Sequence, residues 1–229
     1  MDFFTESFRS AFELITANDP DVISAVTVSV SVSLWSTLFA SIIGLPIGVA
    51  VGAYQFPCKR GIITLLNTLM ALPTVVIGLG VYGILSRQGP MGELGLLFTP
   101  QAMIIGQTLL AIPIIAHNTV SAVTGANPCI IPTAKTLGAG PVQSMFMLVN
   151  EVRFGIVAAV IAGLGRVIAE VGVAMILGGN IRGYTRTMTT AIAMETGKGE
   201  FAFGLALGIV LMGIALIINL FFNTLQQRS

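Results

Sequence analysis

The sequence predicts an all-α integral membrane protein with about five transmembrane helices, on the evidence of its composition, its hydropathy pattern and the absence of strand repeats. Of the 229 residues, 55% are hydrophobic and 9% are charged, whereas a soluble domain carries roughly 25% charged residues. Residues 22–53 contain no charged side chain, and about 20 apolar residues suffice to cross a bilayer. Alternating segments of about 10 residues, which a membrane β-barrel requires, do not recur.

The first 20 residues predict a helix that lies in the membrane interface. Residues 2–17 place apolar side chains on one helical face with charged residues between them, a pattern typical of interfacial helices. A short helix packed on the rest of the protein is an equal alternative. The apolar face consists of Phe3, Phe4, Phe8, Ala11, Phe12 and Ile15.

Five apolar segments follow as predicted spans. They cover residues 22–54, 61–86, 102–123, 154–177 and 201–225. Pro46, Pro73 and Pro113 are predicted to kink the first three spans, because proline removes a hydrogen bond inside a helix. Residues 87–100 and 178–200 are polar and rich in glycine, so we expect both segments to be loops.

Residues 127–153 lie between two spans and predict a short helix, a turn and a second helix. Pro132 falls in the first turn of a helix that ends near Gly138, where glycine enters the left-handed conformation at little cost. Pro141 then opens the second helix. That helix carries apolar residues at helical spacing, namely Met145, Leu148 and Val149. The flanking spans should hold this unit at the membrane surface.

Arg166 and Glu170 are the one pair of full charges inside a predicted span. At i and i+4 they share a helix face and can form an ion pair. An unpaired arginine at mid-membrane costs roughly 2.5–3.5 kcal/mol, so both should face protein or a water-filled path. Two roles stay open: a pathway or gate position for an anion, and a structural ion pair. His117, in the third span, is interpreted as a satisfied residue at a packed helix end rather than a proton relay.

The segment after the fourth span, residues 178–187, is the predicted outer mouth. This segment combines arginines, hydroxyl groups and backbone amides that its glycines leave accessible. Such groups suit transient binding of an oxyanion. The alternative is a solvated loop that contacts a soluble partner. The residues assigned to this mouth are Gly179, Asn180, Arg182 and Arg186.

Several classes of function find no support in the sequence. The phosphate-binding pattern Gly-x4-Gly-Lys-Ser/Thr is missing, so the chain is not an ATPase by that route. We find no nucleophile–base constellation, and the two cysteines, Cys58 and Cys129, have no metal-site spacing. A net charge of +1 without a basic stripe argues against nucleic-acid binding. The N-terminus does not read as a signal peptide. We therefore expect no enzyme activity, cofactor or metal in this chain.

The 127–153 segment resembles the "EAA" loop of ABC-importer permeases, in the spacing of Thr133 and Ala134, Gly138 and Leu148. The sequence departs from the family pattern where Pro132 and Thr133 stand in place of its Glu and first Ala. In that family the loop couples the permease to an ATPase subunit. The resemblance implies that docking involves Pro132, Thr133, Ala134, Lys135 and Gly138. We call residues 127–153 the coupling loop.

The fourth span resembles the molybdate/tungstate branch of these permeases. The pattern Arg166-x-x-x-Glu170-x-Gly172, followed by Gly179-Asn180, is that of the branch, and residues 151–155 and 189–196 look most like tungstate permeases. The resemblance covers the chain from about residue 25 to its end. Alternatives are a permease for molybdate, sulfate or another small anion and, from another class, a non-transporting membrane anchor or assembly subunit.

The resemblance also implies partners and a location. It implies a homodimer in the cell membrane of a bacterium or archaeon, two ABC ATPase subunits that bind ATP-Mg, and an extracytoplasmic tungstate-binding protein. With the coupling loop in the cytoplasm, five spans put the N-terminus outside and the C-terminus in the cytoplasm. Lysine and arginine divide five against five between the two sides in this arrangement, so their count does not decide the orientation.

Overall fold

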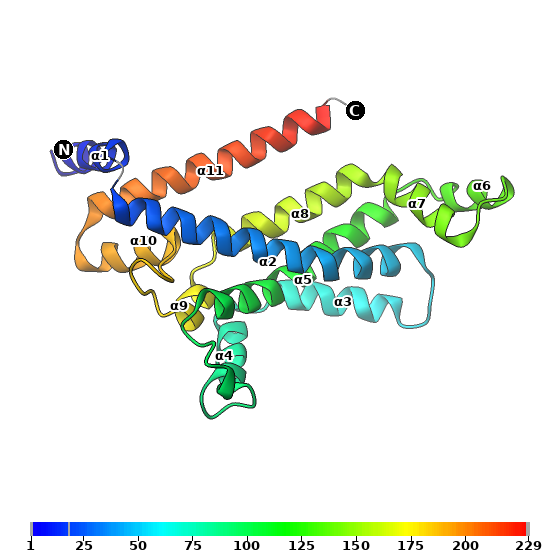
Figure 1. Cartoon of the computed structure of the whole chain (residues 1–229). Helices are drawn as coiled ribbons and strands as arrows, with labels where there is room; N and C mark the ends of the chain where they lie inside the picture. Colours follow the sequence, from blue (N-terminus) through cyan, green and yellow to red (C-terminus); the bar gives the residue numbers. More distant parts are fainter. Residues whose placement is uncertain (1, 18, 228–229) are drawn as a thin grey trace.

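The computed structural model describes residues 2–17 and 19–227, which form helices and connecting turns without a strand in these two ranges (Figure 1). The α-helices are α1 (Asp2–Thr16), α2 (Pro20–Ala53), α3 (Lys59–Met70), α4 (Thr74–Leu85), α5 (Pro100–Thr124), α6 (Ile130–Thr136), α7 (Pro141–Glu151), α8 (Arg153–Ile168), α9 (Gly172–Gly178), α10 (Met188–Lys198) and α11 (Phe201–Gln227). A 3-10 turn, η1 (Gly92–Leu94), lies between α4 and α5.

Helices α2 and α5 form the centre of the molecule, and α8 packs against both. Three glycines of α2, Gly44, Gly48 and Gly52, face α5 at very short range. A Cβ atom added to Gly48 would lie 2.5 Å from Thr119 Cβ and 2.6 Å from the Ala116 carbonyl oxygen. Small residues let two helices approach closely where lipid supplies no hydrophobic driving force. The glycines therefore fix the spacing of the central pair.

Three helices, α2, α5 and α11, are long and apolar enough to cross a membrane. The predicted second span is not one straight helix, because α3 and α4 meet at 92° across a break that contains Pro73. Helices α2 and α5 instead run through Pro46 and Pro113 without a break. A second bent pair, α7 and α8, meets at 66°. Counting each bent pair as one span gives up to five spans.

Two expectations near the fourth span were wrong. Residues 154–177 are not one helix, because α8 ends at Ile168 and α9 starts at Gly172. Residues 178–200 are not all loop, because α10 occupies Met188–Lys198. The Thr187 hydroxyl accepts a hydrogen bond from the Thr190 amide and caps α10, and Gly199 ends the helix in the left-handed conformation.

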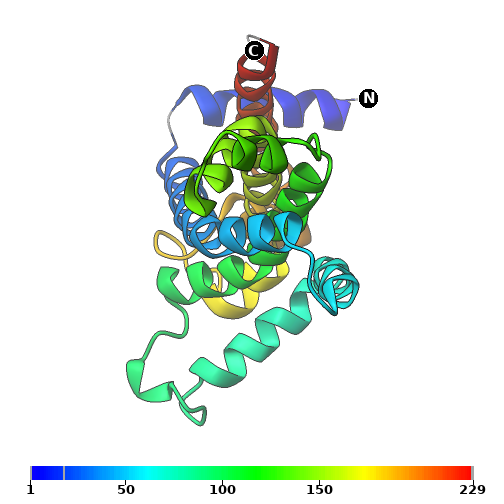
Figure 2. The same ribbon diagram turned by 90° about the vertical axis from the view of Figure 1, so that its right-hand side faces the viewer.

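The predicted N-terminal helix forms and packs on the protein. Figure 2 shows α1 lying crosswise to α11, with which it is in contact. Ser7 and Ala11 are buried, whereas the Phe12 side chain is 67% exposed. The side chains of Phe3, Phe4 and Phe8 lie outside those that the structure describes. The packed alternative thus has direct support, and placement in the membrane interface stays a prediction.

The coupling loop lies at one end of the bundle, while α9, α10 and α1 lie at the other (Figure 1). The two regions assigned to partners from sequence are therefore separated by the length of the central helices. This arrangement suits a protein that contacts different partners on the two sides of a membrane.

Candidate functional site

The Arg166–Glu170 ion pair forms, with 2.8 Å between Arg166 Nη1 and Glu170 Oε2. The two residues do not share a helix as predicted, because Glu170 lies beyond the end of α8 in the break before α9. Their environments differ sharply. The Glu170 side chain is 3% exposed, whereas the Arg166 side chain is 43% exposed.

Glu170 owes its position to the start of α9. Its Oε1 accepts hydrogen bonds from the amides of Gly172 at 2.8 Å and Val173 at 3.2 Å, so it satisfies two of the amide groups that a helix N-terminus leaves free. Its backbone oxygen accepts a bond from the Thr189 hydroxyl of α10 at 2.8 Å. Glu170 thus joins the break to two helices, and this explains why the span is interrupted here.

Arg166 is held by one of its donors and presents the rest to the outside. Within the described residues, its guanidinium donates to Glu170 alone. The Glu170 carboxylate is shared, because Oε2 accepts from the guanidinium and Oε1 accepts from two backbone amides. Glu170 is thus tied into the fold at both oxygens, while the Arg166 side chain is 43% exposed.

Helix α4 begins beside this junction. The Thr74 hydroxyl lies 3.0 Å from the position that a Cβ atom on Gly172 would take, and Glu170 Oε1 lies 3.3 Å from it. The two breaks, at residues 71–73 and 169–171, therefore meet at Gly172. Broken helices that meet inside a membrane protein are typical of substrate pathways.

The predicted outer mouth is a folded turn rather than an open nest. Gly179 has φ +69° and Asn180 has φ +51°, so both lie in the left-handed region. Asn180 is used internally, since its Oδ1 accepts from the Thr190 hydroxyl at 2.9 Å and its Nδ2 contacts Met194 Sδ at 2.8 Å. The Thr185 hydroxyl closes the turn by donating to the Gly178 carbonyl oxygen at 2.5 Å.

Both arginines of this mouth are paired with carboxylates. Arg182 grips Asp21 of α2 with two donors, and Nε lies 2.6 Å from Oδ1. The Asp21 carboxylate, mainly through these hydrogen bonds, raises the pKa of Arg182 above its ordinary value. Arg186 Nη1 lies 3.3 Å from Glu195 Oε1, and Lys198 Nζ lies 3.1 Å from the same oxygen.

The charges around these pairs are balanced. A pocket of about 310 Å³ at this end is lined by three basic residues, three acidic residues and one aromatic, namely Arg182, Arg186, Lys198, Asp21, Glu195, Glu200 and Phe203. The basic side chains of this loop are therefore paired with carboxylates and do not form a free cationic site for an oxyanion. The segment 178–187 is also not a fully solvated loop, because the Arg186 side chain is only 13% exposed.

The coupling loop folds as predicted around Gly138. Helices α6 and α7 pack against each other, Gly138 has φ +87°, and Pro141 starts α7. Pro132, Thr133 and Lys135 are exposed. Ala134 is 1% exposed, so it supports the fold of the loop and cannot itself contact a partner.

Sequence reasoning missed the most exposed apolar side chains of the loop. Leu137 is 78% exposed, Val142 is 83% exposed and Phe146 is 74% exposed. The signal was present, because Val142 and Phe146 stand four residues apart on α7, while Ser144 and Leu148 are buried. We call Leu137, Val142 and Phe146 the apolar patch.

The remaining candidates add no binding group to the site. His117 Nδ1 is buried and has no hydrogen-bond partner among the described residues, so the interpretation of His117 as a satisfied histidine gains no support from it. Cys58 and Cys129 are exposed free thiols. Within residues 2–17 and 19–227, no group of acidic, histidine and cysteine side chains could hold a metal ion.

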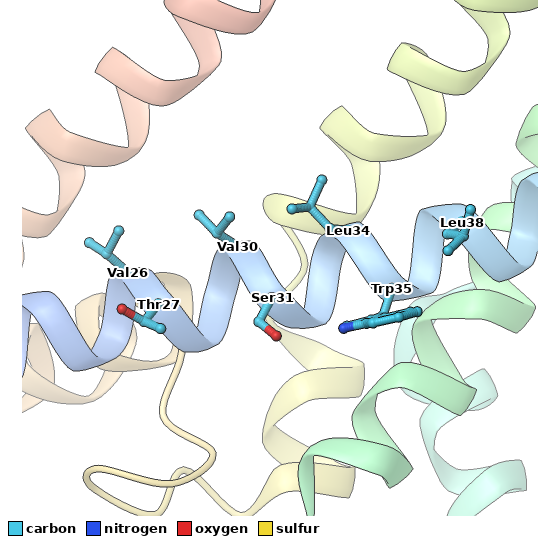
Figure 3. Close-up of a pocket in the computed structure, with 7 residues that line it drawn as sticks. All are labelled: Val26, Thr27, Val30, Ser31, Leu34, Trp35 and Leu38. Carbon is cyan, nitrogen blue, oxygen red and sulfur yellow. The ribbon is translucent and has the colours of Figure 1, made fainter.

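An apolar hollow of about 650 Å³ lies along the outward face of α2 (Figure 3). It is lined by Val26, Thr27, Val30, Ser31, Leu34, Trp35 and Leu38. The lining contains no charged side chain, and Trp35 stacks on Phe39 with 5.8 Å between ring centroids. Such a surface suits hydrocarbon and does not suit an oxyanion.

Comparison with known proteins places the chain in a family, although no family model matches it. It is 40% identical over 228 residues to the tungstate uptake system permease protein TupB of Peptoclostridium acidaminophilum, with 100% of each chain covered. It is also 40% identical over 227 residues to TupB of Campylobacter jejuni, with 99% of this chain and 95% of the relative covered.

The fold matches a solved importer. The inward-facing MetNI methionine ABC transporter aligns with a TM-score of 0.75 at 19% identity, over 91% of this chain and 95% of the matched chain. At that identity the likeness concerns the fold alone. Full-length identity to two permeases and the shared fold agree with an ABC-importer permease. This chain therefore belongs to the TupB family of ABC-importer permease subunits.

Proposed function

We propose that the chain carries tungstate across the cell membrane as the permease subunit of an ABC importer. The observation that carries this proposal is the 40% identity over the full length to tungstate uptake permeases. The subunit is not an enzyme by itself. Its sequence has no phosphate-binding loop, so ATP-Mg belongs to a separate ATPase and transport is driven from there.

The complete importer contains two copies of this chain, two ATPase subunits and an extracytoplasmic tungstate-binding protein. The coupling loop faces the cytoplasm, which puts the N-terminus outside and the C-terminus inside the cell. The separation of the coupling loop from α9 and α10 along the bundle supports partners on opposite sides (Figure 1).

The ATPase docks on the coupling loop, through Pro132, Thr133, Lys135 and the turn at Gly138, with the apolar patch as the centre of the contact. Apolar side chains that are 74–83% exposed gain free energy when a partner covers them. Ala134 acts from inside the loop. Closure of the ATPases then draws the two loops together and tilts the spans.

Tungstate passes Arg166. It is a doubly charged tetrahedral oxyanion, and two copies of the chain would bring two Arg166 guanidinium groups to one pathway. Arginine donates paired hydrogen bonds to oxyanions. Glu170 orients the arginine by its 2.8 Å contact.

The outer mouth, whose arginines are paired with carboxylates, serves as a contact surface for the binding protein rather than as an anion site. Its exposed Arg182, Ile181 and Tyr184 stand on a turn held by internal hydrogen bonds. A preformed surface loses little conformational entropy when a partner binds.

ATP hydrolysis by the reconstituted importer tests the substrate. The permease and its ATPase are placed in liposomes with the binding protein, which is loaded with tungstate, molybdate or sulfate in turn. Stimulation by the tungstate-loaded protein is the expected result. Equal or greater stimulation by the molybdate or sulfate form would assign another anion, and failure to co-purify with an ATPase would refute the importer.

Two substitutions separate the pathway from the docking loop. Arg166→Ala should abolish tungstate uptake while the ATPase still binds, whereas Arg60→Ala, an exposed arginine at the start of α3, should leave uptake unchanged. Gly138→Glu should uncouple ATP hydrolysis from uptake, because a side chain at φ +87° strains the turn. Normal transport by the Gly138 variant would refute the docking assignment.

A further inference from the structure

Helices α2 and α11 pack together at the ends where they start, and α11 then runs away from α2 (Figures 1 and 2). Val22 of α2 is buried in one apolar cluster with Leu207 of α11. Beyond this contact, Val26, Val30 and Leu34 point to the side of α2 on which α11 lies (Figure 3). The divergence leaves the apolar hollow open along α2. We call this hollow the α2 groove.

The α2 groove has the length of one lipid chain. Its lining runs from Val26 to Leu38, a rise of roughly 18 Å at about 1.5 Å per residue. One leaflet of the hydrocarbon core is roughly 15 Å thick, half of about 30 Å. Helix α2 is long and apolar enough to cross a membrane, and the groove has no charged side chain in its lining. The groove therefore fits an acyl chain that lies parallel to the helix.

A charged pocket adjoins the end of the groove that is nearer the start of α2. This is the pocket of about 310 Å³ that Asp21 and Phe203 help to line. Asp21 precedes Val26 by roughly 7.5 Å of helix, at about 1.5 Å per residue. Phe203 joins the two sites, because it lines the charged pocket and packs against the same apolar cluster as Val26.

The charges of this pocket suit a headgroup that carries both signs. Arg186 and Lys198 share one carboxylate oxygen, Glu195 Oε1, so two cations meet one anion. Lys198 uses a single donor there, although an ammonium group has three. The Glu200 carboxylate lines the same pocket and forms no ion pair among the described residues. A phosphate beside Lys198 and an ammonium beside Glu200 would match both side chains.

We propose that each chain binds one phospholipid with a zwitterionic phosphate–ammonium headgroup, with an acyl chain in the α2 groove and the headgroup in the charged pocket. A protein helix over the groove would cover its apolar side chains and leave Lys198 and Glu200 unmatched, whereas this lipid matches the groove and the pocket together. The bound lipid fills the space between α2 and α11 and holds α11 at its angle. The proposal depends on neither the transported anion nor the homodimer.

Tryptophan fluorescence tests the occupant of the groove. Trp35 lines the groove and is the single tryptophan of the chain, and bromine atoms on an acyl chain quench a tryptophan that they touch. The full-length permease is placed in nanodiscs of phosphatidylglycerol with a minor, fixed share of phosphatidylethanolamine that has the same chains. Bromine is carried either by the phosphatidylethanolamine or by an equal amount of the phosphatidylglycerol. We expect at least threefold stronger quenching when phosphatidylethanolamine carries the bromine.

A double variant tests the headgroup pocket separately from the groove. Lys198→Gln combined with Glu200→Gln removes one charge of each sign and leaves the α2 groove intact, so the two brominated lipids should quench Trp35 equally. Arg60→Gln is the control. Arg60 is exposed at the start of α3, and its substitution should leave the preference for phosphatidylethanolamine unchanged.

Each other outcome would overturn the proposal. Equal quenching by the two lipids in the original chain would show bulk lipid in the groove, and stronger quenching by brominated phosphatidylglycerol would show a preference for an anionic headgroup. Weak quenching by both lipids would show that protein, such as a second copy, covers the groove. A preference that survives in the double variant would refute the placement of the headgroup.

Discussion

Removal of the Phe146 ring should weaken binding of the ATPase about 5- to 30-fold. Phe146 is 74% exposed in the isolated chain, and full burial of such a side chain contributes about 1.5–3 kcal/mol. About three quarters of this, or ~1–2 kcal/mol, becomes available when a partner covers the ring. At about 1.4 kcal/mol for each factor of ten, Phe146→Ala loses that much affinity.

The measurement is the dissociation constant of the ATPase for the permease in nanodiscs, from a titration with labelled ATPase. Met212→Ala is the matched control. Met212 is 75% exposed but lies on α11, away from the coupling loop, so its truncation should leave the constant within twofold of the original. The ratio of tungstate transported to ATP hydrolysed should fall only in the Phe146 variant.

A change below twofold for Phe146→Ala would refute the reasoning, because an exposed ring that a partner buries cannot be removed without loss. An equal loss for Met212→Ala would also refute it, since the effect would then come from the membrane-facing surface. Val142→Ala extends the test: if both side chains enter one groove, the two losses should combine in the double variant.

Two further predictions concern stability in detergent, read from thermal unfolding. Glu170→Ala should lower the free energy of unfolding by about 1–3 kcal/mol, because the amides of Gly172 and Val173 and the guanidinium of Arg166 lose their acceptor. Glu170→Gln, which keeps an oxygen, should lower it less, and an equal loss in both variants would contradict the capping role. Gly48→Ala should lower the free energy of unfolding by about 1–3 kcal/mol, because the new methyl group overlaps Thr119. Gly208→Ala, whose added methyl group would have nothing within 4 Å, should be neutral or slightly stabilising. A neutral Gly48 variant would contradict the close packing.

Local signals made the coupling loop predictable. The left-handed Gly138 and the helix start at Pro141 depend on single residues whose backbone preferences act within one turn. The four-residue spacing of Arg166 and Glu170 brings the two side chains within reach, although the pair forms across the end of α8 and not along one helix as predicted. These features need no knowledge of the rest of the fold.

The break at residues 169–171 was not predictable from hydropathy. An apolar stretch of the right length predicts one continuous helix. Glu170 instead caps α9 and accepts a hydrogen bond from Thr189, and these hydrogen bonds stabilise the break. The 92° turn before α4 depends in the same way on packing against α9. Helix α10 had a local signal at Thr187 and Gly199, which its charged residues obscured.

The glycine contact between α2 and α5 has a mechanical consequence. At about 1.5 Å per residue, the 34 residues of α2 form a rod roughly 50 Å long. Because backbone meets side chain at Gly44, Gly48 and Gly52, α2 cannot slide along or roll over α5 without collision. We therefore expect the two helices to tilt together, so that a tilt imposed at the end near the coupling loop also moves the far end.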